Sequence, residues 1–131
     1  MAKLLLVEDN PVSRDLLVRR LANLGFEMFE AANGREALLA AKEHRPHLIL
    51  MDLDMPVMDG RAAMRALRSD WATYRIPIIV LTALSSAKDV ADAVASGCYS
   101  YETKPVVMRR LVERIEEALQ LASPPKEPAA G

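Results

Sequence analysis

Short strand-like runs alternate five times with segments of helical periodicity along this chain, and this alternation constrains its fold more than any other feature. The runs lie at residues 4–7, 27–31, 48–51, 78–81 and 100–103. Such alternation predicts five βα units around a parallel sheet. The third run is apolar on both faces, so we expect it at the centre of the sheet. The fifth run is short and polar and is expected at an edge.

Five helices are expected after these strands, because apolar residues recur there at helical spacing. The first would end at Gly25, a predicted C-cap. The second would follow a turn at Asn33-Gly34 and end at Arg45-Pro46, and the third would run from about residue 61 to 69. The residues assigned to inner helix faces are Leu17, Leu21 and Leu24, then Ala37, Leu38 and Ala41, then Val90, Ala93, Val94 and Gly97, and finally Leu111, Ile115, Ala118 and Ala122.

The composition excludes several classes of protein. A length of 131 residues indicates one domain, expected over residues 1–122, and the Pro-rich residues 123–131 are expected to form a disordered tail. A formal net charge of −1 lacks the basic excess needed for nucleic-acid binding. The single Cys98 cannot form an intramolecular disulfide. The N-terminus has too few consecutive apolar residues for a signal peptide or a membrane span, so we expect a cytoplasmic protein without membrane contact.

Side chains that can carry chemistry stand at the carboxyl ends of four predicted strands. Glu8 and Asp9 follow the first strand, Asp52 the third, Thr82 the fourth and Lys104 the fifth. The carboxyl ends of parallel strands share one edge, and open α/β sheets bind ligands outside that edge. Each residue alone would also suit a turn or a helix cap. Their common placement favours one site.

Carboxylates crowded into one site repel one another and raise each other's proton affinity unless a cation lies between them. A hard divalent ion, most simply Mg²⁺, is bound by such oxygen ligands. Lys104 would add a point charge for a second anionic group, and a phosphoryl group is the ligand that needs both metal and ammonium. The sequence therefore predicts a site for phosphoryl transfer.

Four motifs stand at these positions: LLLVEDN at residues 4–10, MDLDMPVMDG at 51–60, VLTA at 80–83 and TKP at 103–105. In order and spacing they resemble the receiver domain of bacterial two-component response regulators, over about residues 3–122. The resemblance is to a stand-alone, chemotaxis-regulator-like receiver. It implies a flavodoxin-like, doubly wound α/β fold, with five parallel strands in the order 2-1-3-4-5.

The resemblance assigns a role to each acidic residue. Asp52 would be the phosphoacceptor. Asp9, Asp52 and the backbone carbonyl of Asp54 would hold Mg²⁺, and Glu8 would act through a metal-bound water.

The other site residues would bind the phosphoryl group. Thr82, Lys104 and the backbone N–H of Ala83 would contact its oxygens. Lys104-Pro105 resembles the cis peptide of the family, a geometry that proline makes accessible.

A switch from Thr82 to Tyr101 is also implied, because the family's threonine moves toward the phosphoryl group while an aromatic residue turns inward. The downstream protein target would dock on the fourth helix, the fifth strand and the last helix. Two departures from the family pattern lie near this face: Glu102 replaces an apolar residue, and Cys98-Tyr99 replaces a small and an acidic residue. Cys98 is expected to be a buried small residue and not a redox sensor.

The expected donor is a phosphohistidine on a histidine kinase or a histidine phosphotransfer protein. The chain would then be a phosphoacceptor that assists its own phosphorylation and dephosphorylation, and not an enzyme acting on other molecules. Two alternatives stay open. The Asp52-Leu53-Asp54 element also fits an aspartyl phosphatase of the haloacid-dehalogenase type, although such enzymes usually carry it on the first strand. A degenerate receiver could act only as a binding module, and a receiver cut from a hybrid kinase is a further possibility.

Overall fold

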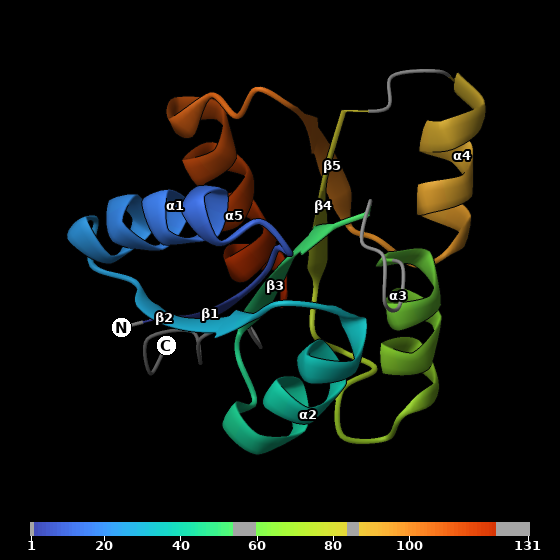
Figure 1. The fold of residues 1–131 in the computed structure, drawn as a ribbon. Coiled ribbons are helices and arrows are strands. Elements are labelled where there is room, and N and C mark those ends of the chain that lie inside the picture. The colour runs from blue at the N-terminus through green and yellow to red at the C-terminus, as the bar shows by residue number, and fades with distance from the viewer. Residues whose placement is uncertain (1, 54–59, 84–86, 123–131) are drawn as a thin grey trace, which may run out of the picture.

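The computed structural model describes residues 2–53, 60–83 and 87–122, and strands and helices alternate strictly through them (Figure 1). The strands form one parallel sheet in the order β2-β1-β3-β4-β5, as the receiver resemblance implied. The elements are β1 (Lys3–Val7), α1 (Pro11–Asn23), β2 (Glu27–Ala31), α2 (Gly34–His44), β3 (Leu48–Asp52), α3 (Gly60–Ser69), β4 (Ile78–Thr82), α4 (Ala87–Ala95), β5 (Ser100–Thr103) and α5 (Met108–Ala122).

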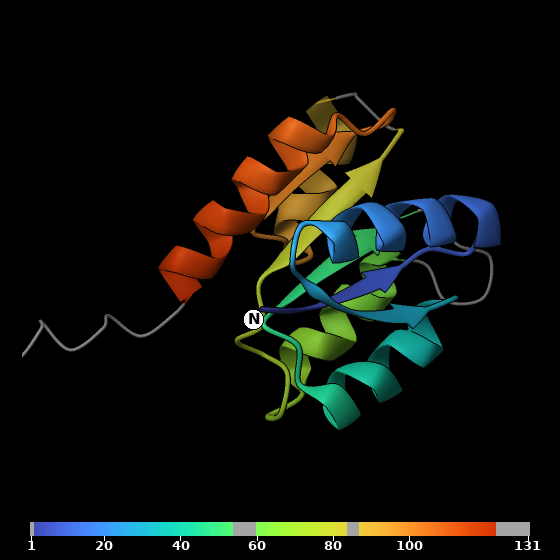
Figure 2. The same ribbon diagram turned by 90° about the vertical axis from the view of Figure 1, so that its left-hand side faces the viewer.

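Helices cover both faces of the sheet, with α1 and α5 on one side and α2, α3 and α4 on the other (Figures 1 and 2). Successive strand residues point to opposite faces and so enter two separate core clusters. In β1, Leu5 and Val7 pack toward α2 and α3, whereas Leu4 and Leu6 pack toward α1 and α5. This double burial explains why the central strands read as continuous apolar runs.

The expected positions of the third and fifth strands are confirmed. β3 lies at the centre of the sheet and is buried along its whole length, and β5 forms an edge. Asp52 and Thr82 are the last residues of β3 and β4, where the sequence pattern had ended each strand one residue earlier. The strand pairing therefore fixes the backbone of both residues.

Two helix ends differ from the prediction. α1 ends at Asn23, so Leu24 is its C-cap and Gly25, with φ of 101°, follows the cap. Asn33 does not form a free turn: its side chain accepts a hydrogen bond from the N–H of Glu36 and caps α2, which begins at Gly34. Asx side chains serve turns and caps equally well, and the sequence alone does not separate the two.

Two residues assigned to inner helix faces are exposed. Leu24 is exposed because the helix has already ended there. Val94 in α4 is 56% exposed, while Ala93 beside it is buried. The apolar stripe of α4 is thus narrower than its sequence periodicity indicates, and Val94 faces the side of β5.

Cys98 is half-buried, and not fully buried as expected. It packs against the core cluster on the α3 side of the sheet. Burial raises the pKa of its thiol, so the reactive thiolate is disfavoured, in agreement with a structural role. In the described part of the chain, no helix is both long and apolar enough to cross a membrane. The expected tail at residues 123–131 lies outside the described residues.

Candidate phosphoryl-transfer site

The acidic pair stands between the end of β1 and the start of α1. Asn10 caps α1 by accepting hydrogen bonds from the N–H groups of Val12 and Ser13, at 2.9 and 3.0 Å. Arg14, one turn into the helix, donates through Nη1 to the carbonyl oxygen of Glu8 at 2.8 Å. These bonds fix the backbone that presents the two carboxylates.

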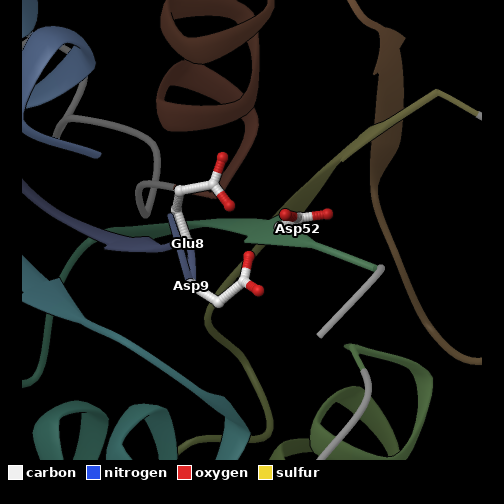
Figure 3. Close-up of side chains that lie close together, drawn as sticks. All are labelled: Glu8, Asp9 and Asp52. Atoms are coloured by element: carbon white, nitrogen blue, oxygen red, sulfur yellow. The ribbon is translucent and has the colours of Figure 1, made fainter. Parts of the chain in front are cut away.

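The carboxylates of Glu8, Asp9 and Asp52 converge at the carboxyl edge of the sheet (Figure 3). Each contributes an oxygen, and these oxygens all lie within 4.8 Å of one another. Glu8 and Asp52 are buried, whereas Asp9 is exposed. The site therefore has a buried base and an open side from which a ligand can approach.

Lys104 reaches this cluster from the end of β5. Its Nζ lies 3.2 Å from Oδ2 of Asp52 and 3.6 Å from Oε1 of Glu8. The Lys104 N–H donates to the carbonyl oxygen of Thr82 at 2.8 Å, which extends the pairing of β4 and β5. The Lys104–Pro105 peptide is cis, in agreement with the receiver resemblance.

Thr82 ends β4 at the same edge and is buried. Ala83 follows it and is exposed. The structure therefore brings together Glu8, Asp9, Asp52 and Lys104 and places Thr82 and Ala83 at the same sheet edge. Asp54 lies outside the described residues.

The pKa of Glu8 shows how strongly the charges of the cluster interact. Burial, with Asp52 as a hydrogen-bond partner and a like charge, raises the pKa of Glu8 from 4.5 to about 7, against the opposing effect of Lys104. Three carboxylates against one ammonium leave an excess of negative charge. A divalent cation would relieve this excess, and carboxylate oxygens are the ligands that Mg²⁺ prefers. The residues present therefore fit Mg²⁺.

Gly60 is a residue whose importance the sequence analysis missed. A Cβ built on Gly60 would lie 2.6 Å from the carbonyl oxygen of Asp52 and 2.7 Å from Cα of Leu53. The first turn of α3 thus packs directly on the backbone of Asp52, and only glycine permits this approach. Its place at the end of the MDLDMPVMDG motif was the available signal, but spacing alone does not reveal a close backbone contact.

Tyr101 lies away from the carboxylates, on the outer side of the edge strand. Val80 pairs with Tyr101 and Thr82 with Thr103, so Tyr101 and Thr82 project from the same face of the sheet. The Tyr101 side chain is 37% exposed, an outward orientation.

Glu102, the departure from the family pattern, is buried on the opposite face of β5. Its two carboxylate oxygens bind Arg110 at 3.3 Å and Arg114 at 2.9 Å, both from α5. The charge that replaces an apolar residue is therefore paired, and it ties α5 to the edge strand.

The chain matches the family model of the response regulator receiver domain over residues 4–116. It therefore belongs to this family, whose members are signalling switches of two-component and phosphorelay systems. This membership disfavours the haloacid-dehalogenase interpretation, which also fails because Asp52 lies on the third strand.

A similar curated protein is the polar-differentiation response regulator DivK of Brucella anthropi, which is 36% identical over 115 residues, covering 88% of this chain and 94% of DivK. The chain spans only about half the length of other relatives that are transcriptional regulators.

Two solved structures have the same fold as this chain. Chemotaxis protein CheY4 of Vibrio cholerae superposes with a TM-score of 0.85 at 32% identity, over 90% of this chain and 98% of CheY4. The receiver domain of sensor histidine kinase PA1611 from Pseudomonas aeruginosa gives a TM-score of 0.84 at 34% identity, over 90% and 97% of the two chains. The PA1611 receiver contains a magnesium ion in its active-site cleft.

Proposed function

We propose that this receiver accepts a phosphoryl group on Asp52 from the phosphohistidine of a histidine kinase or a histidine phosphotransfer protein, and signals by protein contact. The observation that carries the proposal is the convergence of Asp52 with Glu8, Asp9 and Lys104 at the carboxyl edge of the sheet. The single Cys98 suits a reducing compartment, and we place the protein in the cytoplasm.

The acidic cluster would hold Mg²⁺. Asp9, Asp52 and the backbone carbonyl of Asp54 are the proposed ligands, with Glu8 acting through a water. When bound, the ion supplies positive charge that offsets the negative charge on the phosphoryl oxygens. The magnesium in the similar PA1611 receiver supports this assignment.

Phosphoryl transfer requires Asp52 to act as nucleophile. A carboxylate oxygen of Asp52 forms the new bond to phosphorus while the bond from phosphorus to the donor imidazole nitrogen breaks, in line with it. Lys104, already 3.2 Å from Asp52, would shift its ammonium onto the transferred oxygens. Thr82 and the N–H of Ala83 complete the contacts to those oxygens. The protein would therefore assist its own phosphorylation and, through the same groups, the hydrolysis of the aspartyl phosphate.

A cavity of about 320 Å³ beside the site suits a protein donor. It is lined by Leu16 and Leu17 of α1 and by Val106 and Met108 after β5, with Glu8 and Lys104 at its polar end. Apolar side chains next to the nucleophile would bind the helix that carries the donor histidine, whereas a small phosphorylated metabolite offers little to such a surface. This favours a receiver over a small-molecule phosphatase.

The effect of phosphorylation would be transmitted from Thr82 to Tyr101 and so to the face that binds the target. Movement of Thr82 toward the phosphoryl group would open space on the face of the sheet that Tyr101 shares, and the exposed ring can then turn inward. The cavity that Tyr101 and Val94 line, with Tyr99 beside them, is where the target would dock. A beryllofluoride complex, which imitates the aspartyl phosphate, should shift NMR signals from α4 to α5 in the unmodified protein and much less in Thr82→Ala.

Incubation with acetyl phosphate and intact-mass measurement tests the phosphoacceptor function. One acid-labile phosphoryl group should be added with Mg²⁺ present and none after chelation. Glu116→Gln, a change on the exposed side of α5, is the matched control and should label normally. Equal labelling with and without Mg²⁺, or none in either, would contradict the proposal.

A further inference from the structure

A surface of arginine and aromatic side chains lies at the amino-terminal edge of the sheet, opposite the edge that carries the carboxylates (Figure 1). It forms where residues 70–77 connect α3 to β4 and where α4 turns into β5. Trp71, the single tryptophan of the chain, is 87% exposed there, and its ring stacks on Tyr74 with centroids 5.8 Å apart. An indole this exposed adds almost nothing to the core, so its side chain is available for binding.

Arg68 brings a positive charge to this surface. Its guanidinium donates to the carbonyl oxygens of Tyr74, Ile76 and Gly97, at 3.1, 2.7 and 2.8 Å, and forms no ion pair with a carboxylate of the described residues. Burial lowers the pKa of Arg68, but an arginine keeps its charge at neutral pH. The same bonds hold the connection in one conformation, so a ligand would not have to order the backbone first.

Arg75 adds a second guanidinium in a fixed position. Its Nε donates to the Tyr74 hydroxyl at 2.9 Å, and its Cζ lies 5.5 Å from the centre of the Tyr74 ring. Neither contact uses the two terminal nitrogens of Arg75, and no carboxylate in the described part of the chain is paired with it. Those nitrogens suit a carboxylate, which a guanidinium can bind through two parallel hydrogen bonds.

Two hollows in this surface share Arg68 and Tyr74 in their walls. The larger has a volume of about 410 Å³ and is also lined by Arg75 and by Tyr99. The smaller has a volume of about 360 Å³ and is also lined by Trp71. A ligand across both would therefore meet two arginines in one hollow and the exposed indole in the other.

Carboxylates at the margins of these hollows are already engaged. Asp70 lines the smaller hollow and pairs with Lys42 at 2.8 Å. Glu117 of α5 accepts a hydrogen bond from the Tyr99 hydroxyl at 3.2 Å, on the side of the larger hollow away from the connection. The larger hollow therefore keeps an excess of positive charge around Arg75.

We propose that this surface docks an acidic segment of a partner protein, with a carboxylate on Arg75 beside Arg68 and an apolar side chain on Trp71. Charge complementarity selects an acidic partner, because two arginines would repel a cationic one. Tryptophan, tyrosine and arginine are the residues that most often dominate binding at protein interfaces, and this surface presents all three. The site lies across the sheet from Asp52, so docking does not require phosphorylation, and its failure would leave the proposed phosphoacceptor function intact.

Titration of the full chain with an acetylated peptide amide of sequence EELEELEE, followed by NMR, tests the proposal. Shifted signals should concentrate at residues 68–77 and 97–99. Arg75→Gln should weaken the affinity about tenfold, because it removes a charged partner of the carboxylate, and Trp71→Ala should also weaken it. Arg109→Gln, which removes an exposed arginine from α5, is the matched control and should bind the peptide as the unmodified chain does.

Several results would overturn the inference. Equal binding of the neutral peptide QQLQQLQQ would show that charge does not select the partner, and equal weakening by Arg75→Gln and Arg109→Gln would show a general attraction without a site. The same shifts produced by inorganic phosphate at equal concentration would indicate a site for small anions. Shifts that appear on raising the protein concentration alone would assign the surface to a second copy of the chain, and no shifts at these residues would mean that no acidic segment docks there.

Discussion

The Lys104 ammonium lies 3.2 Å from the Asp52 carboxylate, although the two residues are 52 positions apart in the chain. The pair exists because β3 and β5 flank β4 and end at the same edge of the sheet. This contact joins the proposed nucleophile to the group that would stabilise the transferred charge.

Replacing Lys104 should slow phosphorylation without abolishing metal binding. Lys104→Met removes a positive charge from the transition state, and the rate of labelling by acetyl phosphate should fall about 100-fold. Mg²⁺ affinity, measured by titration calorimetry, should be retained or should rise, because the ammonium competes with the ion for the carboxylates. A variant that labels at the normal rate would remove Lys104 from the mechanism.

The unfolding free energy of the metal-free protein should depend on pH through the titration of Glu8. Its pKa is about 7 in the folded protein against an ordinary 4.5, so the folded state binds the proton more tightly. Glu8 therefore contributes stability that is fully present below pH 4.5 and is lost as the pH rises through 7. Glu8→Gln should flatten the unfolding free energy over this window, as measured by urea denaturation.

The proton that Glu8 binds should also weaken the binding of Mg²⁺. Because the metal requires the ionised site, Mg²⁺ affinity of the unmodified protein should increase as the pH rises through about 7. Glu8→Gln should lose most of this dependence, whereas the control Glu116→Gln should keep it. An identical pH profile in all three proteins would mean that Glu8 does not titrate at the site.

Gly60→Ala should displace the backbone that carries the proposed nucleophile, Asp52. The added methyl group would overlap the backbone of Asp52 and Leu53, at a cost of about 1–3 kcal/mol. Phosphorylation should slow even at a matched fraction of folded protein. Gly25→Ala is the control: it strains a positive φ, but its Cβ meets nothing within 4 Å. Equal labelling rates in the two variants would show that the Gly60 contact does not position Asp52.

Glu102 should stabilise the domain through its two arginines. Glu102→Gln leaves a neutral side chain buried against Arg110 and Arg114, and the unfolding free energy should fall by about 1–3 kcal/mol. Arg109→Ala, an exposed change on the same helix, should have little effect on stability. A Glu102→Gln domain as stable as the unmodified one would mean that the ion pairs do not hold α5 to β5.

The strand pattern and the strand-end residues were predictable because burial on both faces and a shared carboxyl edge follow directly from a parallel sheet. The convergence of Asp52 and Lys104 was predicted on that basis. The role of Asn33 was not, since capping and turn formation use the same side chain. Contacts between distant backbones, such as Gly60 with Asp52, leave no periodic signal in the sequence. The ion pairs of Glu102 were likewise not predictable from the sequence, because they depend on which α5 side chains reach β5.

Locating the phosphoryl group on the chain tests the central claim most directly. Borohydride converts an aspartyl phosphate to homoserine, so peptides of the phosphorylated and reduced protein can be sequenced by tandem mass spectrometry. We predict homoserine at position 52 in the unmodified protein, and no homoserine anywhere in Asp52→Ala. Homoserine at another aspartate of the unmodified protein, or a label that resists borohydride and persists in Asp52→Ala, would contradict the account.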